Sequence, residues 1–285
     1  MTPSFELIKQ LFDLPGAEQN SQPSPSRGKK GRDQAESGQF GREAMNAGDY
    51  EAAVEHFKRA VEQSDAKSPW VLMDLAAAYA VTDNVPQAFR QYEKAKLIQK
   101  SGELMVALSG LYSQMGRQND ALDRLREAVE LEPESAYNHH KLADGLRRAG
   151  FKTAALDAAN VAVALAPDQA FYHYWLGEYL LSLGKFREAV DALHAAIELS
   201  PGDDQLYFLV AQALWGSGKK PEAIRAVRLA TDIGTDNRGY RGLLEKFLRA
   251  AGMDEEADME KKKAEGMDPY DHTIVERAAE KLRLN

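Results

Sequence analysis

Residues 136–169 read AYNHHKLADGLRRAGFKTAALDAANVAVALAPDQ, and residues 170–203 read AFYHYWLGEYLLSLGKFREAVDALHAAIELSPGD. The two segments have equal length, and residues of similar size and polarity stand at matching places in both. An offset of 34 residues separates the members of each matching pair: Leu142 and Leu176, Ala143 and Gly177, Gly150 and Gly184, Pro167 and Pro201. A period of this length indicates repeated units of supersecondary structure that stack on one another.

Alanine recurs at the same period through most of the chain. One series is Ala53, Ala88, Ala121, Ala155, Ala189, Ala223 and Ala257. A second series, seven residues later, is Ala60, Ala95, Ala128, Ala162, Ala196, Ala230 and Ala264. Two residues seven apart lie on one face of a helix, where a small side chain lets a neighbouring helix approach closely. The pattern therefore predicts one closely packed helix in every unit.

A turn residue precedes each of these helices. The residues at this place are Gly48, Asp83, Gly116, Gly150, Gly184, Gly218 and Gly252. Glycine suits the left-handed backbone conformation that ends many helices, and aspartate tolerates it. Pro86 and Pro221 follow soon afterwards, near the first position of a helix, where proline is least disruptive. Each unit is therefore predicted to be a helix, a turn and a second helix.

In this arrangement the chain resembles the tetratricopeptide repeat family, whose unit is a helix–turn–helix of about 34 residues. In the fifth repeat the resemblance rests on Leu176, Gly177, Leu180, Gly184, Ala189, Leu193, Ala196 and Pro201. It extends from residue 34 to about residue 269. The resemblance implies an all-α fold, a right-handed α-solenoid of seven tetratricopeptide-like helix–turn–helix repeats with a C-terminal capping helix.

The period divides the chain into consecutive segments. The repeats are expected at about 34–68, 69–101, 102–135, 136–169, 170–203, 204–237 and 238–269. Apolar residues along one helical face of 270–285 predict the capping helix. Residues 1–14 are predicted to form a short amphipathic segment. Residues 15–33 have little apolar content to bury, which predicts a disordered polar linker.

The resemblance also implies a binding surface. In the family, the first helices line a concave groove in which partner segments lie, and their second, fifth, ninth and twelfth positions face it. Carried over, these positions give Trp70, Met73, Tyr137, His140, Asp144, Arg147, Phe171, Tyr174, Glu178, Leu181, Phe208, Gln212 and Trp215, with Ala77, Ala80 and Gln205 between them. Aromatic side chains with polar neighbours are typical binding anchors. The alternative is that these aromatics only pack against the next repeat.

Composition and motifs argue against several kinds of chemistry. The chain has no cysteine, which excludes disulfides, thiolate ligands and a thiol nucleophile. The segment 145–152, GLRRAGFK, has the two glycines of a phosphate-binding loop, but Phe151 stands in place of its lysine. His139, His140 and His173 could gather, because His139 and His173 occupy the same place in adjacent repeats with Asp144 nearby. Packing or groove histidines are commoner there than a metal site. We therefore expect no enzyme activity, no cofactor and no metal.

Charge and apolar content limit the partners. A net charge of −8 argues against nucleic acid, which requires a basic face. The start of the chain, MTPSFELIKQ, lacks the features of an export signal, and no apolar run is long enough to span a bilayer. A cytoplasmic protein without a transmembrane segment is therefore expected.

One binding mode of the family can be tested directly on the sequence. Some chaperone-binding members hold a C-terminal carboxylate with a clamp of lysines, asparagines and an arginine. Counted from the fourth repeat, the corresponding places hold His140, Asp144 and Trp175. Binding of a chaperone through a carboxylate clamp is therefore not expected.

The expected function is that of a non-enzymatic adaptor or scaffold, whose concave groove binds an apolar or amphipathic segment of a partner protein or peptide. The alternative is a self-assembling structural scaffold, a homo-oligomer in which the N-terminal segment of one copy docks on another.

Overall fold

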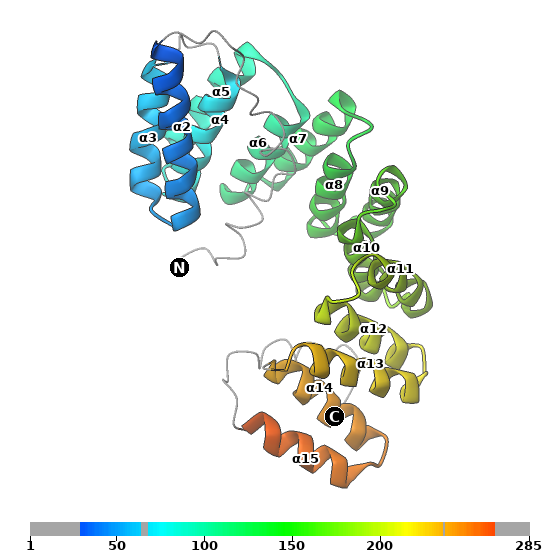
Figure 1. The fold of residues 1–285 in the computed structure, drawn as a ribbon. Helices are drawn as coiled ribbons and strands as arrows, with labels where there is room; N and C mark the ends of the chain where they lie inside the picture. The colour runs from blue at the N-terminus through cyan, green and yellow to red at the C-terminus, as the bar shows by residue number, and fades with distance from the viewer. Residues whose placement is uncertain (1–28, 64–67, 236, 266–285) are drawn as a thin grey trace. The chain divides into compact units, whose positions relative to one another are not determined.

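The computed structural model describes residues 29–63, 68–235 and 237–265, and all of its regular secondary structure in these ranges is helical (Figure 1). Fourteen α-helices lie in the described residues, so the predicted all-α fold class is confirmed. The chain divides into two compact units, Met1–Ala149 and Gly150–Asn285. Each unit is described by itself below.

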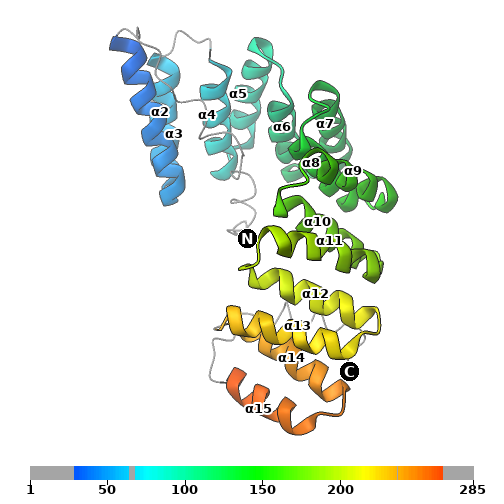
Figure 2. The ribbon, with the colours of Figure 1, turned by 45° about the vertical axis from the view of Figure 1, so that its right-hand side comes forward.

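The described part of the first unit consists of α2 (Lys29–Ala47), α3 (Tyr50–Gln63), α4 (Pro69–Val81), α5 (Val85–Ile98), α6 (Gly102–Gln114), α7 (Gln118–Leu131) and α8 (Ala136–Arg148). Helices α2 and α3, α4 and α5, and α6 and α7 pack as pairs, which lie side by side in both ribbon views (Figure 2). Further contacts join α3 to α4, α5 to α6 and α7 to α8. Each pair therefore packs against the next.

The described part of the second unit consists of α9 (Lys152–Leu165), α10 (Ala170–Ser182), α11 (Phe186–Leu199), α12 (Asp204–Gly216), α13 (Lys220–Ile233), α14 (Arg238–Ala250) and α15 (Asp254–Glu265). Here α10 pairs with α11, α12 with α13, and α14 with α15, while α9 contacts α10. The same helix–turn–helix packing thus recurs in both units.

The turn inside each repeat has the backbone conformation that the sequence predicted. Positive φ angles occur at Gly48, Asp83, Gly116, Gly150, Gly184, Gly218 and Gly252. Asp83, with φ of 57°, is the one residue other than glycine in this conformation within the described ranges. After the turn at Gly184, the N–H of Lys185 donates to the carbonyl of Leu180 at 3.0 Å, which closes the end of α10.

The small residues of the repeat are buried where helices meet. None of the fourteen alanines in the two series is more than 8% exposed. A Cβ atom on Gly177 would stand 2.5 Å from Leu193, and one on Gly41 would stand 2.5 Å from Phe57. Since real Cβ contacts are longer than this, the two helices of the first and fifth repeats approach each other closely here because Gly41 and Gly177 have no side chain.

This close approach predicts opposite effects of alanine at two helical glycines. Gly177→Ala should lower the free energy of unfolding by about 1 kcal/mol, because overpacking against Leu193 exceeds the gain in helix propensity. Gly38→Ala should raise it by a similar amount, since a Cβ there would approach only Arg42, at 3.8 Å. Urea unfolding followed by circular dichroism compares them, and equal effects of the same sign would contradict the packing described.

The first described helix begins earlier than the sequence predicted. Helix α2 starts at Lys29, so it overlaps the predicted linker 15–33, which was expected to continue until the first repeat at residue 34. The physical reason is that no proline follows Pro25 in this stretch, and lysine and arginine favour a helix. The predicted amphipathic segment 1–14 and the predicted capping helix 270–285 lie outside the described residues.

Candidate functional site

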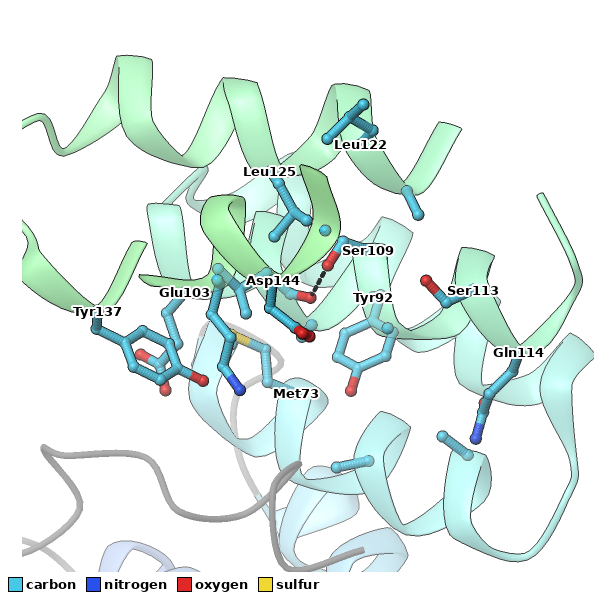
Figure 3. A pocket seen from close by; sticks show the side chains of 18 of the residues that line it. Met73, Tyr92, Glu103, Ser109, Ser113, Gln114, Leu122, Leu125, Tyr137 and Asp144 are labelled. Atoms are coloured by element: carbon cyan, nitrogen blue, oxygen red, sulfur yellow. Dashed lines mark hydrogen bonds between the residues drawn. The ribbon is translucent and has the colours of Figure 1, made fainter. Parts of the chain in front are cut away.

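The first unit contains a pocket of about 340 Å³ whose walls come mainly from helices α4, α6 and α8. Tyr92 of α5 and side chains of α7, including Leu122 and Leu125, complete it (Figure 3). All of these helices belong to one compact unit. First helices of three successive repeats therefore contribute to a single cavity.

Local interactions determine where two of these helices begin. Ser101 caps α6, where its Oγ accepts from the N–H of Leu104 at 3.2 Å. Glu132, which follows α7, accepts from the N–H of Gly102 at 2.8 Å and so ties α6 to the next turn. Ser135 caps α8 in the same way as Ser101 caps α6. These contacts hold the N-terminal ends of α6 and α8 beside the pocket.

The groove residues predicted for the second repeat all line this pocket. They are Trp70, Met73, Ala77 and Ala80. In the fourth repeat, Tyr137 and Asp144 also line it. His140 and Arg147 are absent from the lining, and the neighbouring residues Lys141 and Arg148 are present instead. His140 is buried, with 6% of its surface exposed.

The pocket also contains residues for which no role was predicted. Glu103, Val106, Gly110 and Ser113 line it from α6. They occupy the second, fifth, ninth and twelfth positions of the third repeat, so the spacing used for the other repeats identifies them as well. Tyr92 belongs to a second helix and lies outside this spacing, and no sequence signal pointed to it.

Two carboxylates and a tyrosine make one side of the pocket electronegative. Burial raises the pKa of Asp74 to about 6, although Arg42, whose Nη1 lies 3.1 Å from its Oδ2, acts to lower it. The pKa of Glu103 is raised by burial and by the charges of Asp74 and Glu132. Burial and these two neighbouring carboxylates, Asp74 and Glu103, also raise the pKa of Tyr92. Ionising Asp74 and Glu103 on this side of the pocket therefore costs free energy.

The carboxylate on α8, Asp144, is paired with two arginines of its own helix. Asp144 accepts from Arg147 at 2.8 Å and lies 2.5 Å from Arg148. Lys141, also on α8, has its Nζ 5.2 Å from the centre of the Tyr137 ring, within the range of a cation–π contact. The α8 side of the pocket therefore carries more positive than negative charge, since Lys141 and Arg148 line it beside Asp144, in contrast to the side formed by Asp74 and Glu103.

In the second unit the predicted groove residues separate into two groups. Phe171 is 48% exposed, and Tyr174 and Glu178 are partly exposed. The buried group consists of Leu181, Phe208, Gln212 and Trp215. Trp215 stacks on Phe247 of α14 with ring centres 4.1 Å apart. Phe208 likewise lies against Tyr240 of α14, with ring centres 5.1 Å apart, so these two aromatic residues pack against the next repeat.

His139 and His173, two of the histidines considered for a metal site, each contact the carbonyl of a proline six residues earlier. The ring Nε2 of His139 lies 2.9 Å from the carbonyl of Pro133, and that of His173 lies 2.9 Å from the carbonyl of Pro167. Tyr207 makes the corresponding contact, donating its hydroxyl to the carbonyl of Pro201 at 3.1 Å. The described ranges hold no group of three or more side chains that could bind a metal ion.

Two segments of the sequence match the profile of a known family. A profile described as tetratricopeptide repeat matches residues 39–102 and 174–238, one match in each compact unit. The chain is a tetratricopeptide-repeat protein. A comparison with curated protein sequences found no match. No enzyme family was detected, and the tetratricopeptide scaffold is typically non-catalytic.

Solved structures with the same fold resemble this tetratricopeptide-repeat protein. A crystal structure of MamA is 28% identical, with a TM-score of 0.51, and the match covers 57% of this chain and 96% of that one. The C-terminal part of a tetratricopeptide-repeat protein from Cytophaga hutchinsonii has a TM-score of 0.65 at 14% identity, covering 84% and 98%. YrrB, described as having an unusual peptide-binding site, has a TM-score of 0.51 at 19% identity, covering 65% and 95%.

Tetratricopeptide-repeat proteins generally mediate protein–protein interactions. In the part of this tetratricopeptide-repeat protein that the structure describes, no helix combines the length and the apolar character needed to cross a lipid bilayer.

Proposed function

We propose that this tetratricopeptide-repeat protein is a non-enzymatic adaptor that binds a segment of a partner protein in the pocket between α4, α6 and α8. The supporting observation is that groove positions of three successive repeats line one cavity. Side chains from separate repeats can read several residues of an extended or helical segment at once. The segment expected from the walls is apolar or amphipathic.

The accessible aromatic residues support this use of the pocket. Trp70 keeps 48% of its surface exposed at the pocket wall, beside the buried Met73. An exposed tryptophan beside apolar walls is the kind of anchor that contributes most of the binding energy in protein interfaces. A cavity of about 340 Å³ accommodates a few side chains of a partner rather than a folded domain.

Small residues explain why there is a cavity here. Ala77, Ala80, Ala107 and Gly110 line the pocket and leave its volume unfilled. In the second unit, the larger side chains of Leu181, Trp215 and Phe247 occupy buried positions of the first helices. YrrB is described as having a peptide-binding site, so the shared fold is compatible with such a site. We propose Phe171, Tyr174 and Glu178 of α10 as a second contact surface for a partner.

Site-specific photocrosslinking in cells tests the proposal. A benzoylphenylalanine residue in place of Trp70 preserves an aromatic side chain at the pocket wall, and one in place of Leu97, which is 87% exposed on α5 and does not line the pocket, is the matched control. We expect a partner protein to crosslink at position 70 and not at position 97. The same crosslinked proteins at both positions, or none at position 70, would refute a partner site in this pocket.

A further inference from the structure

We propose that the pocket selects a lysine or arginine side chain in the bound segment, and that Glu103, Asp74 and the hydroxyl of Tyr92 receive its cationic group. This inference rests on the proposed function, since it specifies the chemistry of the segment that the same pocket binds. It rests on charge complementarity and on two polar side chains of the lining that make no hydrogen bond to another described residue.

Glu103 is the first of these groups. It lines the pocket, is only partly exposed, and has neither a hydrogen bond nor an ion pair with any residue in the described ranges. The other carboxylates of the lining differ, because Asp74 is paired with Arg42 and Asp144 with Arg147 and Arg148. A half-buried carboxylate without a cation is the group that gains most from an incoming one.

Tyr92 is the second group. Only 5% of its surface is exposed, and it lines the pocket. Its hydroxyl makes no hydrogen bond with another described residue, while the charges of Asp74 and Glu103 both act on it. The Tyr92 hydroxyl is not among the fully buried side-chain atoms that lack a partner in the described ranges, so its oxygen can accept a hydrogen bond from an ammonium or guanidinium bound in the pocket.

On the side of the pocket formed by Asp74 and Glu103 the electrostatics favour a cation, while Lys141 and Arg148 line the α8 side. Asp74 and Glu103 disfavour each other's charge, which an additional anion would aggravate and a cation would relieve. The walls beside them include Met73 and Val106, both buried. Lysine and arginine have long aliphatic stems that pack on apolar surface while the charged end reaches polar groups. The pocket therefore fits a basic side chain with an apolar residue next to it.

A display selection tests which segments bind. Phage-displayed random twelve-residue peptides are selected on the full chain, and the binding of enriched peptides is remeasured with Trp70→Ala. We expect enriched peptides to share a lysine or arginine close to an apolar residue. Enriched peptides without a basic residue that lose affinity with Trp70→Ala would overturn this inference and leave the proposed function standing. No enriched peptide, or none affected by Trp70→Ala, would count against both.

A thermodynamic cycle then tests the contact itself. Fluorescence anisotropy measures an enriched peptide and its analogue with the basic residue replaced by norleucine, on wild type and on Glu103→Gln. We expect about a tenfold weaker affinity from either change alone and almost no further loss from both, because they remove the same contact. If the two changes together weaken the affinity by the product of their separate effects, the proposal is overturned.

Two further variants serve as controls for this cycle. Glu134→Gln makes the same change of charge at an exposed residue of the same unit, outside the pocket, and should leave both affinities unchanged. Tyr92→Phe keeps the ring in the core and removes only the hydroxyl, and we expect it to weaken the basic peptide several-fold without affecting the norleucine analogue. Equal weakening of both peptides by Tyr92→Phe would contradict a role of the hydroxyl in receiving the cation.

Discussion

Replacing Trp215 with alanine is expected to lower the free energy of unfolding by about 3–5 kcal/mol. Only 7% of the Trp215 surface is exposed, and its ring stacks on Phe247 at an interplanar angle of 11°. Lys220 also approaches the ring, with its Nζ 5.2 Å from the centre. Truncation would therefore leave a large cavity between α12 and α14, which packing on either side cannot easily fill.

The matched variant is Trp70→Ala, the same substitution at a tryptophan that is 48% exposed. We expect it to cost only about 1 kcal/mol of stability, because half of the ring is already in contact with water. Urea unfolding monitored by circular dichroism gives the stability loss of each variant. A binding assay with a partner segment then compares their affinities. Trp70→Ala should impair binding with little effect on stability. Similar stability losses for the two variants would show that Trp70 is also a packing residue.

This pair of tryptophans illustrates what the sequence could predict. The period identified the turn residues and the buried alanines, because both depend on contacts repeated in every unit. It assigned Trp70 and Trp215 to one groove, because both occupy groove positions of their repeats. It could not show which of them is covered, since that depends on the residue opposite. Phe247 covers Trp215, whereas Ala77 and Gly110 leave space at the pocket that Trp70 lines.

The candidate site was predictable to a similar extent. Within the first helices, the second position stays at least partly exposed in Trp70, Glu103, Tyr137 and Phe171, as expected of a groove. The fifth position is buried in Met73, Val106, His140 and Phe208. The second and fifth positions are three residues apart and lie on the same face of a helix, so helical spacing alone could not distinguish the exposed position from the buried one. The contribution of Tyr92, from a second helix, depends on tertiary packing alone.

Burial of His140 predicts that acid destabilises the protein. Burial lowers the pKa of His140 to about 3, from an ordinary value of 6.5, and the charge of Lys141 acts in the same direction. The folded chain therefore keeps this imidazole neutral at a pH where the unfolded chain binds a proton. Stability from this group is complete above pH 6.5 and is lost progressively as the pH falls toward 3. Between pH 7 and pH 4.5 the expected loss is about 2 kcal/mol.

His140→Gln tests this, because glutamine is polar but does not titrate in this range. The free energy of unfolding is measured in urea at pH 7 and pH 4.5 for wild type and variant. The difference in free energy of unfolding between the two proteins at pH 7 gives the cost of changing the packing. The amount by which this difference changes at pH 4.5 gives the contribution of the proton. Carboxylates such as Asp74 and Glu103 titrate in both proteins and cancel in this comparison. We expect the variant to lose about 2 kcal/mol less than wild type on acidification. Equal losses in the two proteins would show that His140 becomes protonated inside the folded chain.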